Sequence, residues 1–157
     1  MNCLTEKQLS MEQIVPLIRE SLAEGKSVRF SPKGVSMKPM LRQGKDSVVL
    51  SAVPERLKKY DLPLYQRENG QYVLHRVVTV GDTYTCVGDN QFVLETWVEH
   101  HQMIAVVSAF ARDGRRIEAD DPGYRLYCRI WCASRPVRHL WRRGTGWLKR
   151  AARRCLK

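Results

Sequence analysis

A serine and a histidine lie in segments of this chain that could place them for nucleophilic catalysis. Ser36 stands in a stretch framed by Gly34 and Pro39, which favours a turn that both exposes and fixes the hydroxyl. His75 stands in an alternating run that is typical of a strand. A serine hydroxyl is a weak nucleophile until a nearby base takes its proton. The pair therefore suggests acyl transfer, although either residue alone could be structural, Ser36 in a turn and His75 in a core.

Two acids beyond the histidine are candidates for the group that orients it. Asp89 lies in the tripeptide Gly-Asp-Asn, and Glu95 follows shortly after. A catalytic histidine needs such a partner on its second ring nitrogen. The Asp-Asn pair is also a good turn in any protein.

Other clusters of reactive residues are discounted as metal sites. His100 and His101 are adjacent, so on a strand they would point to opposite faces, and no cysteine or carboxylate completes a known spacing. Cys128 and Cys132 lie one helical turn apart without two further ligands, and we interpret them as packing residues. The chemistry suggested by Ser36 needs no metal, and neither a metal nor another cofactor is predicted.

The elements expected to hold these residues are a helix, a β domain and a basic tail. Residues 10–24 carry apolar side chains at helical spacing behind a Ser10–Gln13 capping box. From Val28, short runs rich in Val, Leu and Tyr alternate with turns, which is typical of antiparallel β structure. The expected fold class is mainly β, of the α+β type, with an N-terminal helix in 1–27, a β domain in 28–122 and a basic amphipathic helical tail in 123–157.

The charge of the chain is concentrated in that tail. The 157 residues include 27 Lys and Arg and 16 Asp and Glu, for a net charge of +11. The last acid is Asp121, whereas residues 125–157 hold nine Arg and two Lys, so the body is neutral. The tail also carries an apolar stripe at helical spacing, formed by Leu126, Ile130, Ala133, Val137 and Leu140.

Three interpretations of the tail are compatible with its composition. It could lie on an anionic membrane surface through residues 125–157, or pack its stripe on the β domain; these two are ranked equal. Nucleic acid is ranked lower because no DNA-binding motif precedes the domain. Three features of the sequence favour a cytoplasmic location: scattered cysteines, no signal-peptide pattern and no apolar run of membrane-spanning length. Peripheral attachment at the inner face of the membrane is the alternative.

Several motifs occur in an order and spacing that resembles the signal peptidase I / LexA-like serine peptidase superfamily. They are Gly-x-Ser-Met-x-Pro around Ser36, a Gly-Lys-Asp turn before a Val-rich run, Asp-x-x-Leu-Tyr, Val-Leu-His-Arg-Val around His75, and Gly-Asp-Asn. The resemblance covers Lys33 to about Val107, roughly half of the chain. Because histidine stands where many members have lysine, the chain is similar to the histidine-base subgroup, and as a whole to small bacterial members without a transmembrane anchor.

The resemblance implies a LexA/signal peptidase-like fold and assigns roles to the candidate residues. Ser36 matches the nucleophile and His75 the general base. Asp89 is slightly favoured over Glu95 as the orienting acid. The residues expected beside the substrate are Gly34, Met37 and Pro39, of which the last two could equally shape the turn.

The same resemblance leaves the oxyanion site incomplete. The backbone N–H of Ser36 would be one donor. Some relatives add a serine hydroxyl two residues earlier, where this chain has Gly34. Losing one such donor typically costs about 100- to 1000-fold in rate. The enzyme would be slow or would use another donor.

The function expected on this basis is a serine endopeptidase that cleaves an extended leader or precursor peptide through a Ser–His pair and an acyl-enzyme. The substrate would bind by β-augmentation. The alternative is a catalytically decayed module of the same fold that binds a peptide or partner and is located by its basic tail. A LexA-like self-cleaving switch is disfavoured because the 27 residues before Val28 cannot hold a helix-turn-helix domain and a linker.

Overall fold

Short antiparallel strands form most of the chain, with one helix before them and one after. The computed structural model describes residues 10–142. The elements in chain order are α1 (Met11–Ala23), β1 (Val28–Phe30), β2 (Ser47–Ser51), β3 (Pro63–Gln66), β4 (Tyr72–Leu74), β5 (Arg76–Val80), β6 (Tyr84–Val87), β7 (Glu95–Val98), the 3-10 helix η1 (His100–Gln102), β8 (Met103–Arg112), β9 (Arg115–Glu118) and α2 (Pro122–Ala133). The expected mainly β, α+β class is confirmed.

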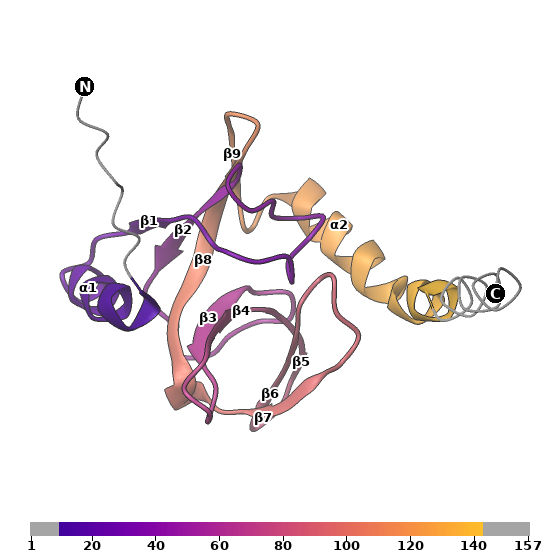
Figure 1. The fold of residues 1–157 in the computed structure, drawn as a ribbon, viewed down its shortest axis with the longest axis horizontal. Coiled ribbons are helices and arrows are strands. Elements are labelled where there is room, and N and C mark those ends of the chain that lie inside the picture. The colour runs from indigo at the N-terminus through magenta and orange to yellow at the C-terminus, as the bar shows by residue number, and fades with distance from the viewer. Residues whose placement is uncertain (1–9, 143–157) are drawn as a thin grey trace, which may run out of the picture.

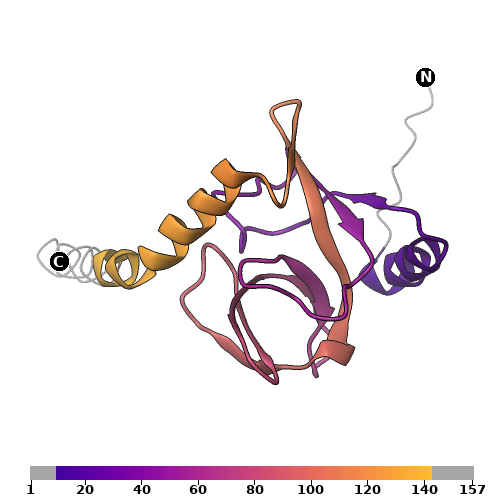
Figure 2. The same cartoon turned by 180° about the vertical axis from the view of Figure 1, so that it is seen from behind.

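The strands form two sheets. The chain passes from the first sheet to the second after β4 and returns to the first at β8. One sheet has the order β1-β2-β8-β3-β4, with β9 also paired to β8, and the other has the order β5-β6-β7. The long strand β8 runs the height of the molecule, and α1 and α2 lie on opposite sides of the sheets (Figures 1 and 2). The crossing from β4 to β5 occurs at residue 75, which places His75 where the two sheets meet.

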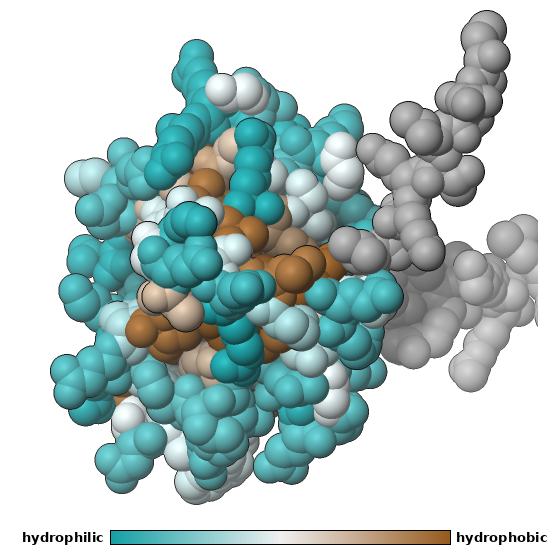
Figure 3. Space-filling view, turned by 90° about the vertical axis from the view of Figure 1, so that its left-hand side faces the viewer, coloured by the Kyte–Doolittle hydropathy of each residue, from teal (hydrophilic) through white to brown (hydrophobic). Residues whose placement is uncertain are grey.

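The helix α1 begins at the capping signal that the sequence carries. The backbone N–H of Ser10 donates to Gln13 Oε1 at 3.1 Å. The apolar side of the helix is buried in the main core, through Val15, Ile18 and Leu22. The outward surface on this side of the molecule is mostly hydrophilic, with a cluster of hydrophobic residues at its centre (Figure 3).

One charged side chain, Arg76, is completely buried and joins three parts of the fold. Its Nε and Nη2 donate to the two carboxylate oxygens of Asp89 at 2.8 and 2.7 Å. Its Nη1 donates to the Tyr124 hydroxyl and to Cys128 Sγ, each at 2.9 Å, and also to the Tyr60 carbonyl at 3.2 Å. Because Tyr124 and Cys128 belong to α2, the guanidinium ties that helix to β5 and to the loop that carries Asp89.

The described part of the basic tail, up to residue 142, therefore packs on the body, but by a different face from the one that the apolar spacing marks. Tyr124 and Cys128 are the buried residues of α2. Leu126 and Ile130, which belong to the predicted stripe, are exposed. Residues 143–157 of the expected tail lie outside the described residues. In the portion of the chain that is described, no helix has the length and apolarity needed to cross a bilayer.

We predict that Asp89→Asn lowers the free energy of unfolding by about 3–5 kcal/mol, because it leaves the buried Arg76 guanidinium without a counter-charge. The control is Asp113→Asn. Asp113 pairs with Arg42 but its side chain is 69% exposed, so the loss there should stay below about 1 kcal/mol. Urea unfolding followed by circular dichroism measures both. Equal losses in the two variants would contradict a special role for the buried pair.

Candidate active site

Ser36 lies in a tight loop between β1 and β2 that is anchored to the core by Met37, Met40 and Leu41. Two turns shape the loop, with the Lys38 N–H donating to the Val35 carbonyl at 3.2 Å and the Leu41 N–H to the Met37 carbonyl at 2.9 Å. Met37 and Leu41 are buried, whereas Ser36 is only half-buried. The loop is therefore anchored by its buried side chains, and Ser36 lies near the surface.

The Gly-Asp-Asn tripeptide holds this loop from the other side. The Asn90 N–H donates to the Ser36 carbonyl at 2.7 Å, and Asn90 Nδ2 donates to the Val35 carbonyl at 3.2 Å. A Cβ atom added at Gly88 would stand only 2.7 Å from the Ser36 carbonyl oxygen, so only glycine allows this close approach. The tripeptide thus sets the position of the candidate nucleophile through backbone contacts.

His75 is buried at the point where the chain passes from one sheet to the other, and only 1% of its surface is exposed. Its Nδ1 lies 2.8 Å from Glu95 Oε1. The two atoms are close, but their geometry does not meet that of an N–H···O hydrogen bond, so the contact is the electrostatic attraction between a carboxylate oxygen and the polar ring edge. This contact favours the tautomer with the proton on Nδ1 and leaves Nε2 as the basic nitrogen.

Glu95, at the start of β7, is fixed by donors from the neighbouring sheet. Arg67 Nε and the Tyr65 hydroxyl donate to Oε2 at 2.9 and 2.8 Å, and Arg67 Nη2 pairs with Oε1. Burial acts to raise the pKa of Glu95, but the hydrogen bonds from Arg67 and Tyr65 and the nearby His75 outweigh it and lower the pKa. The carboxylate therefore stays charged beside the histidine.

The same environment keeps His75 neutral. Burial is the largest influence on its pKa and lowers it below the ordinary value of 6.5; the positive charge of Arg67 acts in the same direction, whereas Glu95 opposes both. At neutral pH the imidazole is then unprotonated, which is the form that a general base requires.

The two candidate acids have different partners. Asp89 gives both carboxylate oxygens to Arg76, whereas Glu95 faces His75. The slight preference for Asp89 as the orienting acid does not match these contacts. The physical reason is that His75 and Arg76 are consecutive residues and point to different sides of the chain, and Asp89 lies on the arginine side.

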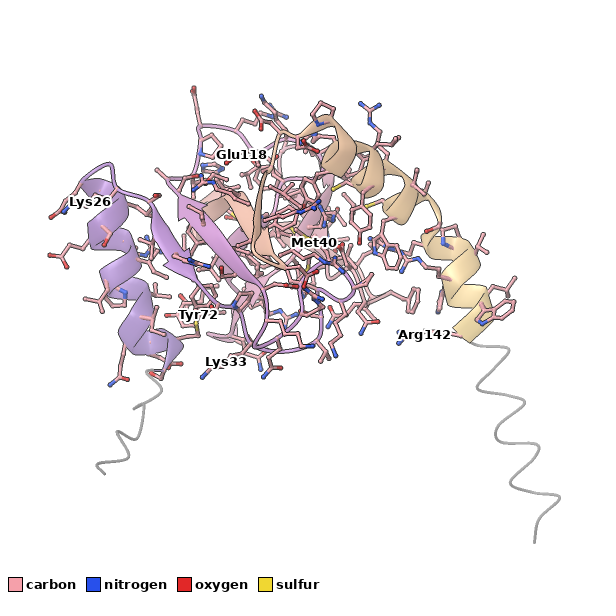
Figure 4. All side chains as sticks on the ribbon, turned by 90° about the horizontal axis from the view of Figure 1, so that it is seen from above. Lys26, Lys33, Met40, Tyr72, Glu118 and Arg142 are labelled. Atoms are coloured by element: carbon pink, nitrogen blue, oxygen red, sulfur yellow. The ribbon has the colours of Figure 1, made fainter. Side chains whose placement is uncertain are left out.

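Ser36 lines a cavity of about 170 Å³ with β4, the strand that leads directly into His75. Gly34 and Met37, two of the residues expected beside the substrate, line it as well. Figure 4 labels Lys33 and Tyr72, which both line this cavity. Pro39, the third expected residue, instead lines a separate groove next to the helical region that follows α2.

Gln43 is a polar residue of this cavity that the sequence did not single out. Its Oε1 accepts a hydrogen bond from the Gly34 N–H at 3.0 Å. This bond uses the acceptor end of the amide of Gln43, which lines the cavity together with Ser36. No sequence motif marks Gln43, because its role depends on how the loop folds back.

The structure places Ser36 beside β4, the strand directly before His75, but His75 itself does not line the cavity that Ser36 lines. Among residues 10–142, the Ser36 hydroxyl and the His75 ring share no hydrogen bond. Catalytic hydrogen bonds are often long in free enzymes and tighten when substrate binds. Catalysis by this pair would require the hydroxyl to approach the ring.

The residues discounted as metal ligands have ordinary partners. His100 Nδ1 lies 3.2 Å from the Tyr84 hydroxyl, and His101 Nδ1 lies 2.9 Å from Glu99 Oε2. Over the described part of the chain, no group of three or more His, Cys, Asp or Glu side chains could hold a metal ion.

Comparisons with known proteins find no family model, no curated protein and no solved structure that matches this chain. Function must therefore be inferred from the geometry around Ser36, His75 and Glu95.

We predict that two charge-removing substitutions shift the pKa of His75 in opposite directions. Glu95→Gln removes the negative charge that favours the imidazolium, so the pKa should fall further below 6.5. Arg67→Gln removes the positive charge that disfavours it, so the pKa should rise. An NMR pH titration of the ring resonances measures both values. The exposed neighbour Glu68, changed to Gln, serves as control. Shifts in the same direction would contradict the proposed electrostatics.

Proposed function

We propose that the protein is a serine endopeptidase with the LexA/signal peptidase-like fold, acting through Ser36 and His75. The observation that supports this most is the buried, neutral His75 with Nδ1 turned to a fixed Glu95 carboxylate. That arrangement leaves Nε2 for a nucleophile, and Ser36 lines a cavity beside β4, which ends at Leu74, directly before His75.

The reaction proceeds through an ester on Ser36. The Ser36 Oγ attacks the carbonyl carbon of a peptide bond while His75 Nε2 takes the hydroxyl proton. The tetrahedral intermediate collapses when that proton passes to the leaving amine, which breaks the C–N bond. A water molecule then attacks the ester, His75 again takes and returns a proton, and the acid product leaves. Glu95 stabilises the imidazolium in both stages.

The substrate that suits this site is an extended peptide. β4 is the last strand of its sheet within residues 10–142, so one of its edges is available to another strand. The cavity that contains Ser36 runs along β4, through Tyr72, Val73 and Leu74. A peptide added to that edge would pass Ser36, and the cavity of about 170 Å³ suits one small side chain.

Gln43 supplies the oxyanion donor that Gly34 cannot. The oxygen of the tetrahedral intermediate needs donors in addition to the Ser36 N–H. Gln43 lines the same cavity as Ser36, and its amide is held by the Gly34 N–H through its oxygen. Its Nε2 is then the remaining side-chain donor of this amide.

The test of the enzyme is covalent labelling with a fluorophosphonate, located by mass spectrometry. The intact protein should be labelled at Ser36, Ser36→Ala should abolish labelling, and His75→Ala should slow it by about 100-fold or more. Ser31→Ala is the control, because Ser31 is an exposed serine just before the loop. Labelling that ignores Ser36 would exclude the mechanism. Peptide binding without labelling would instead support the catalytically decayed binding module.

A second prediction separates the two ends of the Gln43 amide. Gln43→Ala should slow the fluorophosphonate reaction by about 100-fold, the usual effect of losing one oxyanion donor. Gln43→Glu keeps an oxygen for the Gly34 N–H but has no N–H to donate, so it should be slowed at least as much. A fully active Gln43→Glu variant would show that the residue only supports the loop.

A further inference from the structure

The C-terminal helical region exposes large apolar side chains on its outer face. Residues 135–142 are helical and follow α2 after a turn at Ser134. The exposed apolar residues of the two segments are Leu126, Ile130, Val137, Leu140 and Trp141, each between 56% and 74% exposed. We call these five residues the outer stripe. Solvent exposure of so many large apolar groups on one helical region marks an interaction surface.

The outer stripe is exposed although the region itself is firmly attached to the body. Trp131 Nε1 donates to the Asp89 carbonyl at 3.1 Å, and Arg138 Nη1 donates to the same oxygen at 3.3 Å. Arg142 Nη1 donates to the Asn90 carbonyl at 3.3 Å. The inner face is thus held against the Gly-Asp-Asn loop, and the outer stripe stays exposed, with Val137 and Trp141 at the border of the groove beside Lys38 and Pro39.

The charge around the outer stripe has one sign. Residues 122–142 contain five arginines and no acid, and the sequence from 143 to 157 adds four Arg and two Lys, again without an acid. A helical region with an apolar face and only cationic charges has the properties of helices that lie in the headgroup region of a bilayer.

We propose that the outer stripe docks the protein on an anionic lipid surface. Leu126, Ile130 and Leu140 would enter the apolar boundary, Trp141 would lie at the interface, and the arginines would face the headgroups. A nucleic acid would engage the arginines but gains nothing from exposed aliphatic side chains. An acidic protein partner matches the charge of the arginines but does not account for the exposed apolar side chains of the outer stripe. The lipid surface accounts for both features at once.

Docking would bring the membrane close to the nucleophile loop. A groove of about 610 Å³ lies between Lys38 and Pro39 of that loop and Val137 and Trp141 of the helical region. This consequence rests on the proposed peptidase activity: docked protein would cleave peptides that lie at the membrane surface. The docking itself does not depend on catalysis.

Vesicle co-sedimentation with the full chain tests the docking. Vesicles of phosphatidylcholine with phosphatidylglycerol should retain the protein, and vesicles of phosphatidylcholine alone should not. The triple variant Ile130→Gln, Leu140→Gln and Trp141→Gln should lower the partition coefficient by at least about ten-fold, because it removes apolar area without changing charge. These side chains are exposed, so the variant should keep its fold, which circular dichroism verifies.

Two controls make the outcome specific. Leu17→Gln changes an apolar residue that is 55% exposed on α1, a helix on the opposite side of the molecule (Figure 1), and should bind like the wild type. Ser36→Ala should also bind normally, so that docking and catalysis fail or succeed separately. Retention on neutral vesicles, no retention on anionic ones, or an unaffected triple variant would each overturn the proposal. Retention of both wild type and triple variant on a DNA duplex would assign the charge to nucleic acid instead.

Discussion

The position of the candidate site depends on one buried ion pair, Arg76 with Asp89. A guanidinium without solvent must satisfy its donors inside the protein, and Arg76 does so with Asp89, Tyr124 and Cys128 among others. Burial acts to lower the pKa of Arg76, but the hydrogen bonds and charge of Asp89 outweigh it and raise the pKa, so the guanidinium stays charged. Because Asn90 follows Asp89 and donates to the Ser36 carbonyl, the pair also fixes the nucleophile loop.

The two consecutive residues His75 and Arg76 thus have different roles: Arg76 stabilises the fold, and His75 belongs to the candidate site. Arg76 turns into the core and takes Asp89, while His75 turns to Glu95 at the junction of the sheets. Arg76 and His75 therefore face different acids, and the Glu95 carboxylate beside His75 is also bound by Arg67. Had Asp89 been the partner of His75, Arg76 would have remained buried without a counter-charge, which is among the most costly arrangements in a protein interior.

Local patterns predict the elements of this fold better than they predict its side-chain partners. The capping box at Ser10 and the alternation of short apolar runs account for the first helix and the antiparallel class, because both depend on residues close in sequence. The partner of His75 could not be read in the same way. It depends on Arg67, which directly follows β3 of the other sheet and holds the Glu95 carboxylate in place. Gln43 was missed for a related reason, since only the folded loop brings it to Ser36.

The tail illustrates why an apolar stripe does not by itself identify the packed face of a helix. Tyr124 and Trp131 face inward because each combines a ring that fills space with a polar group that finds a partner, the Arg76 guanidinium for one and the Asp89 carbonyl for the other. The aliphatic residues of the outer stripe have no polar group, so they could not satisfy the buried arginine and the backbone carbonyls on this side of the body. The region therefore packs through Tyr124 and Trp131, whose polar groups have partners in the body, and the outer stripe remains exposed to solvent.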